Sequence, residues 1–154
     1  KYILIIRNLK YVSNSINKKK WFENKSLKND LQFPNIIYKN HLIPYWVPRN
    51  KYKMWINLSS IDRSYYYTYI QYSSFYKFYK KNKKIITVIN YEKLCEDPLN
   101  YSKKTLNLLG LKFGKYTLKI IRSIKKKDYK KLKDPQNVFI KKKIEDLNLI
   151  LNKI

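Results

Sequence analysis

The chain has 154 residues, 44% of them hydrophobic, so it is long and apolar enough to bury the core of one domain. Its formal net charge of +25 indicates an anionic partner, which is a nucleic acid, a phosphorylated cofactor or an acidic membrane. The single cysteine excludes an internal disulfide, and with only one histidine the composition argues against a structural zinc site.

The charge has a competing explanation in the composition. Lysine, asparagine, isoleucine and tyrosine dominate while alanine is absent, as expected of a coding sequence rich in A and T. Charge alone therefore does not select a partner. No apolar run approaches the roughly 20 residues that span a bilayer, and Tyr2–Ile6 is shorter than the signal-peptide core of about 7 residues. We expect a cytoplasmic protein without a membrane span.

The chain opens on a strand pattern. Tyr2–Arg7 is a continuous aliphatic run, which predicts a central parallel strand covered on both faces. Lys10–Asn17 follows with helical spacing of its apolar residues and ends in a lysine run. Because proteins rarely begin inside a core strand, we expect the chain to be a piece of a longer protein.

The middle of the chain combines an irregular stretch with a long helix. Three prolines interrupt Trp21–Asn57, which predicts a long and functionally important loop. Ser59 or Ser60 is expected to cap a helix that reaches about Lys81, with Asp62 in its first turn. A helical stripe of tyrosines is expected to pack in the core: Tyr65, Tyr69, Tyr72, Tyr76 and Tyr79.

A second β-branched run, Ile85–Asn90, predicts a second buried strand. Asp97 and Pro98 are typical of a helix start, and Gly110 is typical of the end of that helix. Three more segments are expected after it: a helix over Tyr116–Ile124, a basic run over Lys125–Lys133, and a terminal helix over Gln136–Lys153 that Asp134 and Pro135 begin. This order favours an α/β domain with a parallel sheet.

Arg7 is the first candidate functional residue. It stands where the first strand ends, and ligands of open α/β folds bind at this edge of the sheet. Its guanidinium presents a fork of donors that suits a phosphate, and the Ser15 hydroxyl on the next helix can donate to the same anion. The alternative is that Arg7 pairs with a carboxylate and Ser15 is a surface serine. Glu92, at the end of the second strand, can hold a backbone or an arginine in place.

Two segments, taken in order, resemble the sulfotransferases that use 3′-phosphoadenosine 5′-phosphosulfate (PAPS). In that family a strand ends in Arg, Asn or Asp follows, and a Ser stands eight residues after the Arg. The segment IIRNLKYVSNS matches this pattern with Arg7, Asn8 and Ser15. It departs from the pattern at Leu9, where the family usually has Pro. Later in the chain the family has a strand followed by Tyr-Glu-Asp-Leu, then Asp-Pro, and then a helix that ends in a Leu-Gly-Leu element. The segments YEKLCEDP and LLGLKF are similar to these elements. Lys93 replaces the acid of the Tyr-Glu-Asp-Leu element.

The resemblance implies a three-layer fold like that of the P-loop NTPases, present here as its C-terminal portion. It implies transfer of a sulfuryl group from PAPS to a hydroxyl or amine. Arg7 and Ser15 would bind the 3′-phosphate of the cofactor, and Tyr66 or Tyr69 would lie near the adenine. The Arg-Lys-Gly signature, by which some members contact the phosphate again, is absent after Arg122.

Residues 1–154 are therefore expected to form a partial sulfotransferase domain. The 5′-phosphosulfate loop of the family precedes the 3′-phosphate strand and contains glycine, but Gly110 and Gly114 both lie far after Arg7. The catalytic base of the family also lies upstream, and His41 is expected to be a surface or structural residue. The acceptor stays open among carbohydrates, peptides and small alcohols.

Two other hypotheses remain from the sequence. Lysine runs with interleaved tyrosines are compatible with a nucleic-acid-binding module, which requires one contiguous basic face. A non-catalytic remnant of the sulfotransferase fold would differ from the enzyme only in the segment that precedes Tyr2.

Overall fold

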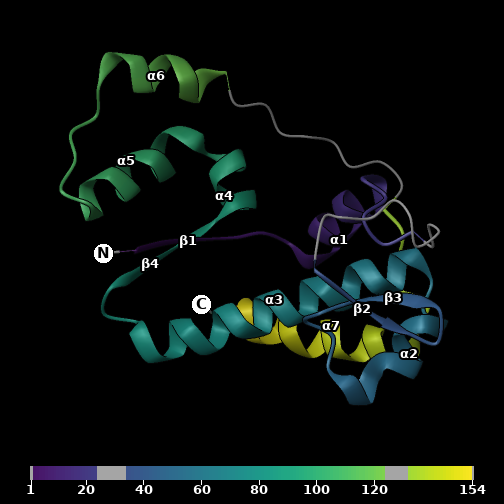
Figure 1. Cartoon of the computed structure of the whole chain (residues 1–154). Coiled ribbons are helices and arrows are strands. Elements are labelled where there is room, and N and C mark those ends of the chain that lie inside the picture. The colour runs from purple at the N-terminus through teal and green to yellow at the C-terminus, as the bar shows by residue number, and fades with distance from the viewer. Residues whose placement is uncertain (1, 24–33, 124–131, 154) are drawn as a thin grey trace.

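The computed structural model describes residues 2–23, 34–123 and 132–153 (Figure 1). Helices dominate it, and they surround two small sheets. The elements are β1 (Tyr2–Ile6), α1 (Leu9–Lys18), β2 (Asn35–Tyr38), β3 (His41–Pro44), the 3-10 helix η1 (Arg49–Lys51), α2 (Tyr52–Asn57), α3 (Ser60–Asn82), β4 (Ile86–Asn90), α4 (Tyr91–Glu96), α5 (Pro98–Leu108), α6 (Lys115–Arg122) and α7 (Val138–Leu151).

The first and fourth strands pair in parallel. Tyr2 faces Ile86 and Ile6 faces Asn90 in this register, so the predicted α/β class with a parallel sheet is confirmed at that level. The prediction that β1 is covered on both faces is wrong. Ile3 is 45% exposed and Ile5 is 57% exposed. Among the described residues β1 pairs only with β4, so this sheet has two strands.

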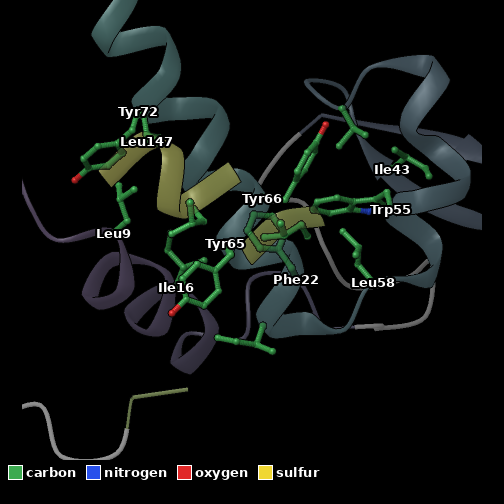
Figure 2. Close-up of a cluster of buried hydrophobic side chains, with 14 of the residues drawn as sticks. Leu9, Ile16, Phe22, Ile43, Trp55, Leu58, Tyr65, Tyr66, Tyr72 and Leu147 are labelled. Carbon is green, nitrogen blue, oxygen red and sulfur yellow. The ribbon is translucent and has the colours of Figure 1, made fainter. Parts of the chain in front are cut away.

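The core lies where α1 and α7 pack against α3 (Figure 2). On α1, Leu9, Ser13 and Ile16 are buried at helical spacing, and the Ser13 hydroxyl donates to Thr68 on α3 at 3.0 Å. Tyr65 is the largest fully buried side chain. From Ile61 to Thr68 every residue of α3 except Tyr67 is buried, because other elements surround this part of the helix.

The predicted tyrosine stripe is only partly correct. Tyr65 and Tyr72 are buried, but Tyr69, Tyr76 and Tyr79 are half-buried. The start of α3 is confirmed, since the Ser59 hydroxyl accepts the Asp62 N–H at 3.3 Å.

Buried polar side chains attach the segment before α7 to this core. Asn14 donates to the Lys133 carbonyl and accepts the Lys133 N–H, both at 2.8 Å. One carboxylate oxygen of Asp62 accepts the N–H groups of Gln136 and Asn137 at 2.8 and 3.0 Å. We call these contacts of Asn14 and Asp62 the polar clamp.

The clamp explains why the terminal helix starts later than expected. Asp62 holds the backbone of Gln136 and Asn137 outside the helix, so α7 begins at Val138 with Asn137 as its N-cap. Asp134 instead forms an ion pair with Lys10 at 2.7 Å. Residues 125–131 of the expected basic run, and residue 124 at the end of the helix expected before it, lie outside the described ranges.

The stretch expected to be irregular contains a β-hairpin. β2 and β3 pair antiparallel, with Tyr38 opposite His41. Lys39 and Asn40 form the turn with φ values of 50° and 60°. Two successive left-handed residues match the twist of a two-residue hairpin, but the usual sequence is Asn-Gly, so the pattern was missed.

The C-terminal half of the chain follows the sequence more closely. Asp97 caps α5 through the Asn100 N–H and Pro98 is its first residue, as expected. Gly110 ends this helix with a φ of 71°, which a glycine adopts without steric cost. The short helix α4 was not expected, although Asn90 caps it through the Lys93 N–H.

Replacing Asp62 by alanine tests the polar clamp. We expect Asp62→Ala to lower the free energy of unfolding by about 2–4 kcal/mol, because two backbone N–H groups lose a buried charged acceptor. The matched control is Asp146→Ala on the exposed side of α7, for which we expect a change within about 0.5 kcal/mol. Urea unfolding measures both, and equal effects would contradict the role given to the clamp.

The buried tyrosines predict sensitivity to alkaline pH. Burial is the main cause that raises the pKa of Tyr65, Tyr66 and Tyr72 above the ordinary value of 10.0. The unfolded chain releases these protons near pH 10 while the folded chain retains them, so the free energy of unfolding falls as the pH rises further. Urea unfolding at pH 8 and pH 11 should differ by at least about 1.4 kcal/mol.

The matched variants separate this effect from tyrosine ionisation in general. Tyr65→Phe should reduce the pH dependence, whereas Tyr116→Phe, at a residue that is 86% exposed, should leave it unchanged. A free energy of unfolding that is constant from pH 8 to pH 11 would refute the prediction.

Candidate phosphate-binding site

A cavity of about 280 Å³ opens at the carboxyl ends of β1 and β4. This is the sheet edge at which the sequence placed a ligand. The strand ends, α4 and the last turn of α7 contribute the side chains around it. Its lining residues are Ile6, Arg7, Asn8, Asn90, Glu92, Lys93, Glu96, Asn148, Leu151 and Asn152.

Arg7 follows the last residue of β1, and both its backbone and its side chain are held. Its N–H donates to the Tyr72 hydroxyl of α3 at 3.2 Å. Its guanidinium carbon lies 4.7 Å from the centre of the Tyr91 ring, at cation–π distance. Its Nε lies 3.9 Å from Glu92 Oε1, with both side chains about three-quarters buried. The arginine is therefore oriented before any ligand binds.

Glu92 connects the ends of the two parallel strands. The same Oε1 that faces Arg7 accepts the Asn8 N–H at 3.0 Å, 84 positions away in the sequence. Asn8 is the N-cap of α1, and its own side chain accepts the Lys10 N–H. The expectation that Glu92 holds a backbone group or an arginine is met on both counts. At 3.9 Å its contact with Arg7 is longer than the roughly 2.7–2.9 Å of a charge-assisted hydrogen bond.

The aromatic groups beside Arg7 are neutral at physiological pH. A side-chain hydrogen bond with Cys95 is the first cause that raises the pKa of Tyr91. Burial raises the pKa of Tyr72 despite the N–H of Arg7, which acts in the opposite direction. Both rings therefore present uncharged hydroxyl groups, so they add no negative charge to compete with an anion.

Ser15 does not line this cavity. It is half-buried in the second turn of α1, about 9 Å along the helix from Leu9 at 1.5 Å per residue. Its neighbours Ser13 and Asn14 both point into the core, where they bond Thr68 and Lys133. Within the described residues, Arg7 and Ser15 thus belong to one strand–helix unit without sharing one cavity.

The two adenine candidates also lie away from the cavity. Tyr66 is buried, with its ring centre 6.4 Å from Trp46, 6.2 Å from Trp55 and 6.5 Å from Tyr69. Tyr69 is half-buried one turn later on α3. Tyr66 is therefore part of an aromatic cluster, and an adenine contact stays a prediction for both residues.

Sequence reasoning missed three residues that shape this site. Tyr72 was assigned to a core stripe, yet its hydroxyl fixes the backbone of Arg7. Asn148 and Asn152 reach the cavity from α7, and no local pattern in a terminal helix indicates such a contact. His41 lies in β3 with an exposed side chain, away from Arg7.

The comparisons with known proteins leave the family open. No family model, no curated protein and no solved structure matches this chain. The geometry at the carboxyl ends of β1 and β4 therefore stands on its own as evidence for the site.

The position of Glu92 gives a stability prediction. Glu92→Ala should lower the free energy of unfolding by about 1–2 kcal/mol, because it removes the acceptor for the Asn8 N–H and the charge beside Arg7. Glu92→Gln, which keeps an acceptor oxygen, should cost about half as much. Urea unfolding with Glu145→Ala, an exposed glutamate on α7, provides the control. Equal stability of all three variants would exclude this connection between the strands.

Proposed function

We propose that this chain is the 3′-phosphate-binding portion of a PAPS-dependent sulfotransferase with a P-loop-NTPase-like three-layer fold. The observation that carries the proposal is a contact between the two segments on which the resemblance depends. Glu92 of the YEKL segment contacts both Arg7 and Asn8 of the IIRN segment. Segments that resemble the same family in sequence thus meet at one sheet edge, where α/β folds bind ligands.

Arg7 would bind the 3′-phosphate of the cofactor. Its planar guanidinium can donate two parallel hydrogen bonds to phosphate oxygens, and Tyr72, Tyr91 and Glu92 orient it. The N-terminus of α1, which begins two residues later, places the positive end of a helix dipole on the same side. A hydrogen bond from Ser15 is not required for this contact, because Ser15 does not line the cavity.

The reaction of the family passes the sulfuryl group from the 5′-phosphate of PAPS to an acceptor oxygen or nitrogen. The bond from sulfur to the phosphate oxygen breaks, a bond to the acceptor forms, and a base takes the acceptor proton, which leaves adenosine 3′,5′-bisphosphate. The 5′-phosphosulfate loop and this base belong before the strand that ends at Arg7. The contribution proposed for these 154 residues is therefore to hold the cofactor and to form part of the acceptor pocket.

Binding of adenosine 3′,5′-bisphosphate tests the proposal by isothermal titration calorimetry. We expect Arg7→Ala to weaken binding at least tenfold, because a charge-assisted contact is worth about 1.5–3 kcal/mol. Arg7→Lys keeps the charge but loses the fork, and we expect it to bind with intermediate affinity. Adenosine 5′-monophosphate, which lacks the 3′-phosphate, should bind wild type as weakly as the bisphosphate binds Arg7→Ala.

The control variant is Arg49→Ala, which removes the same charge from an exposed position in η1. Thermal melting of each variant shows whether it is folded. If a folded Arg7→Ala protein bound the bisphosphate as tightly as Arg49→Ala, the role of Arg7 would be refuted.

A further inference from the structure

The C-terminal half of α3 carries an exposed apolar patch away from the candidate site. Figure 1 shows this end of α3 reaching past α7 toward the turn that enters β4. Four side chains form the patch, and each is at least two-fifths exposed. They are Tyr2 (60%), Phe75 (44%), Phe78 (51%) and Ile85 (43%), and we call them the α3 tip.

Tyr2 and Phe78 are in ring contact, and backbone or helix geometry brings Phe75 and Ile85 near them. The rings of Tyr2 and Phe78 meet edge to face with their centres 6.5 Å apart. The Tyr2 N–H donates to the Ile85 carbonyl at 2.7 Å, which joins the start of β1 to the residue before β4. Phe75 lies one turn before Phe78, with its ring centre 6.1 Å from the buried Tyr72. The patch therefore continues the core-facing side of α3 into solvent.

A dense positive charge accompanies these apolar side chains. Five lysines lie within eight residues, and all five are exposed: Lys77, Lys80, Lys81, Lys83 and Lys84. Between Asp62 and Glu92 the chain contains no acidic residue. This end of the molecule is therefore apolar and cationic at once.

Lysines border the aromatic side of the helix. Phe75 and Phe78 are three residues apart, so they share one side of α3, and Lys81, three residues after Phe78, lies at the edge of that side. Exposed aromatic residues combined with lysines are typical of helices that lie in the interface of an anionic membrane. Among the residues that the structure describes, no helix is long and apolar enough to cross the bilayer.

We propose that the α3 tip docks on an anionic lipid surface. Phe75, Phe78 and Ile85 enter the boundary between headgroups and acyl chains, while the lysines remain among the acidic headgroups. A second copy of the chain fits less well, because it brings another net charge of +25 to the contact. A nucleic acid would use the lysines, but it offers no apolar medium for Ile85, and Phe78 already packs edge to face on Tyr2.

Vesicle co-sedimentation tests the proposal. The probes are phosphatidylcholine vesicles with and without about one-third phosphatidylglycerol, at physiological ionic strength. We expect binding to the anionic vesicles only. Phe75→Ser/Phe78→Ser, which leaves the charge unchanged, should lower the partition coefficient at least about tenfold. Lys83→Gln/Lys84→Gln should lower it by about tenfold or more.

The control is Val138→Ser/Leu149→Ser, which removes two exposed apolar side chains from α7 and should bind as wild type does. Thermal melting confirms that each variant is folded. If the phenylalanine variant bound anionic vesicles as strongly as wild type, the binding would depend on net charge alone and the proposal would fail. It would also fail if a single-stranded oligonucleotide displaced the protein from vesicles and bound it with an affinity that depends on Phe75 and Phe78.

Discussion

The parallel pairing of β1 with β4 is the constraint on which the candidate site depends. It joins two short strands that are more than 80 positions apart in the sequence, and their carboxyl ends then lie side by side. Arg7 leaves one strand and Glu92 follows the other, so a single carboxylate oxygen reaches both Arg7 and Asn8. A slip of one residue in this register would turn these side chains to opposite faces of the sheet.

The remainder of the fold supports this edge from one side. α1 follows Arg7 directly, and it is fixed by Leu9, Ile16 and the polar clamp against α3 and the segment before α7. α3 in turn supplies the Tyr72 hydroxyl to the backbone of Arg7. The opposite face of the sheet is less well covered, as the exposure of Ile3 and Ile5 shows. The α1–α3 core thus positions the backbone of Arg7, while Tyr91 and Glu92 of α4 orient its side chain.

Much of this arrangement follows from the sequence, and the exceptions have physical causes. The caps at Asp97 and Gly110 depend on local chemistry and were predicted, as was the start of α3 at one of two serines, of which Ser59 is the cap. The start of α7 depends on Asp62, a residue 75 positions before Asn137, so no local pattern reveals it. The hairpin uses Lys39 and Asn40 in left-handed conformations that are typical of glycine. At the site, Arg7 and Glu92 stand at strand ends and were identified, whereas Tyr72, Asn148 and Asn152 reach it through tertiary packing.

The central proposal is that Arg7, held at the carboxyl end of β1, binds the 3′-phosphate of the cofactor. A crystal structure of the protein soaked with adenosine 3′,5′-bisphosphate tests it most directly. The proposal predicts that the 3′-phosphate lies within hydrogen-bond distance of the Arg7 guanidinium. A nucleotide bound through the lysines of α3, or a phosphate that does not contact Arg7, would contradict it.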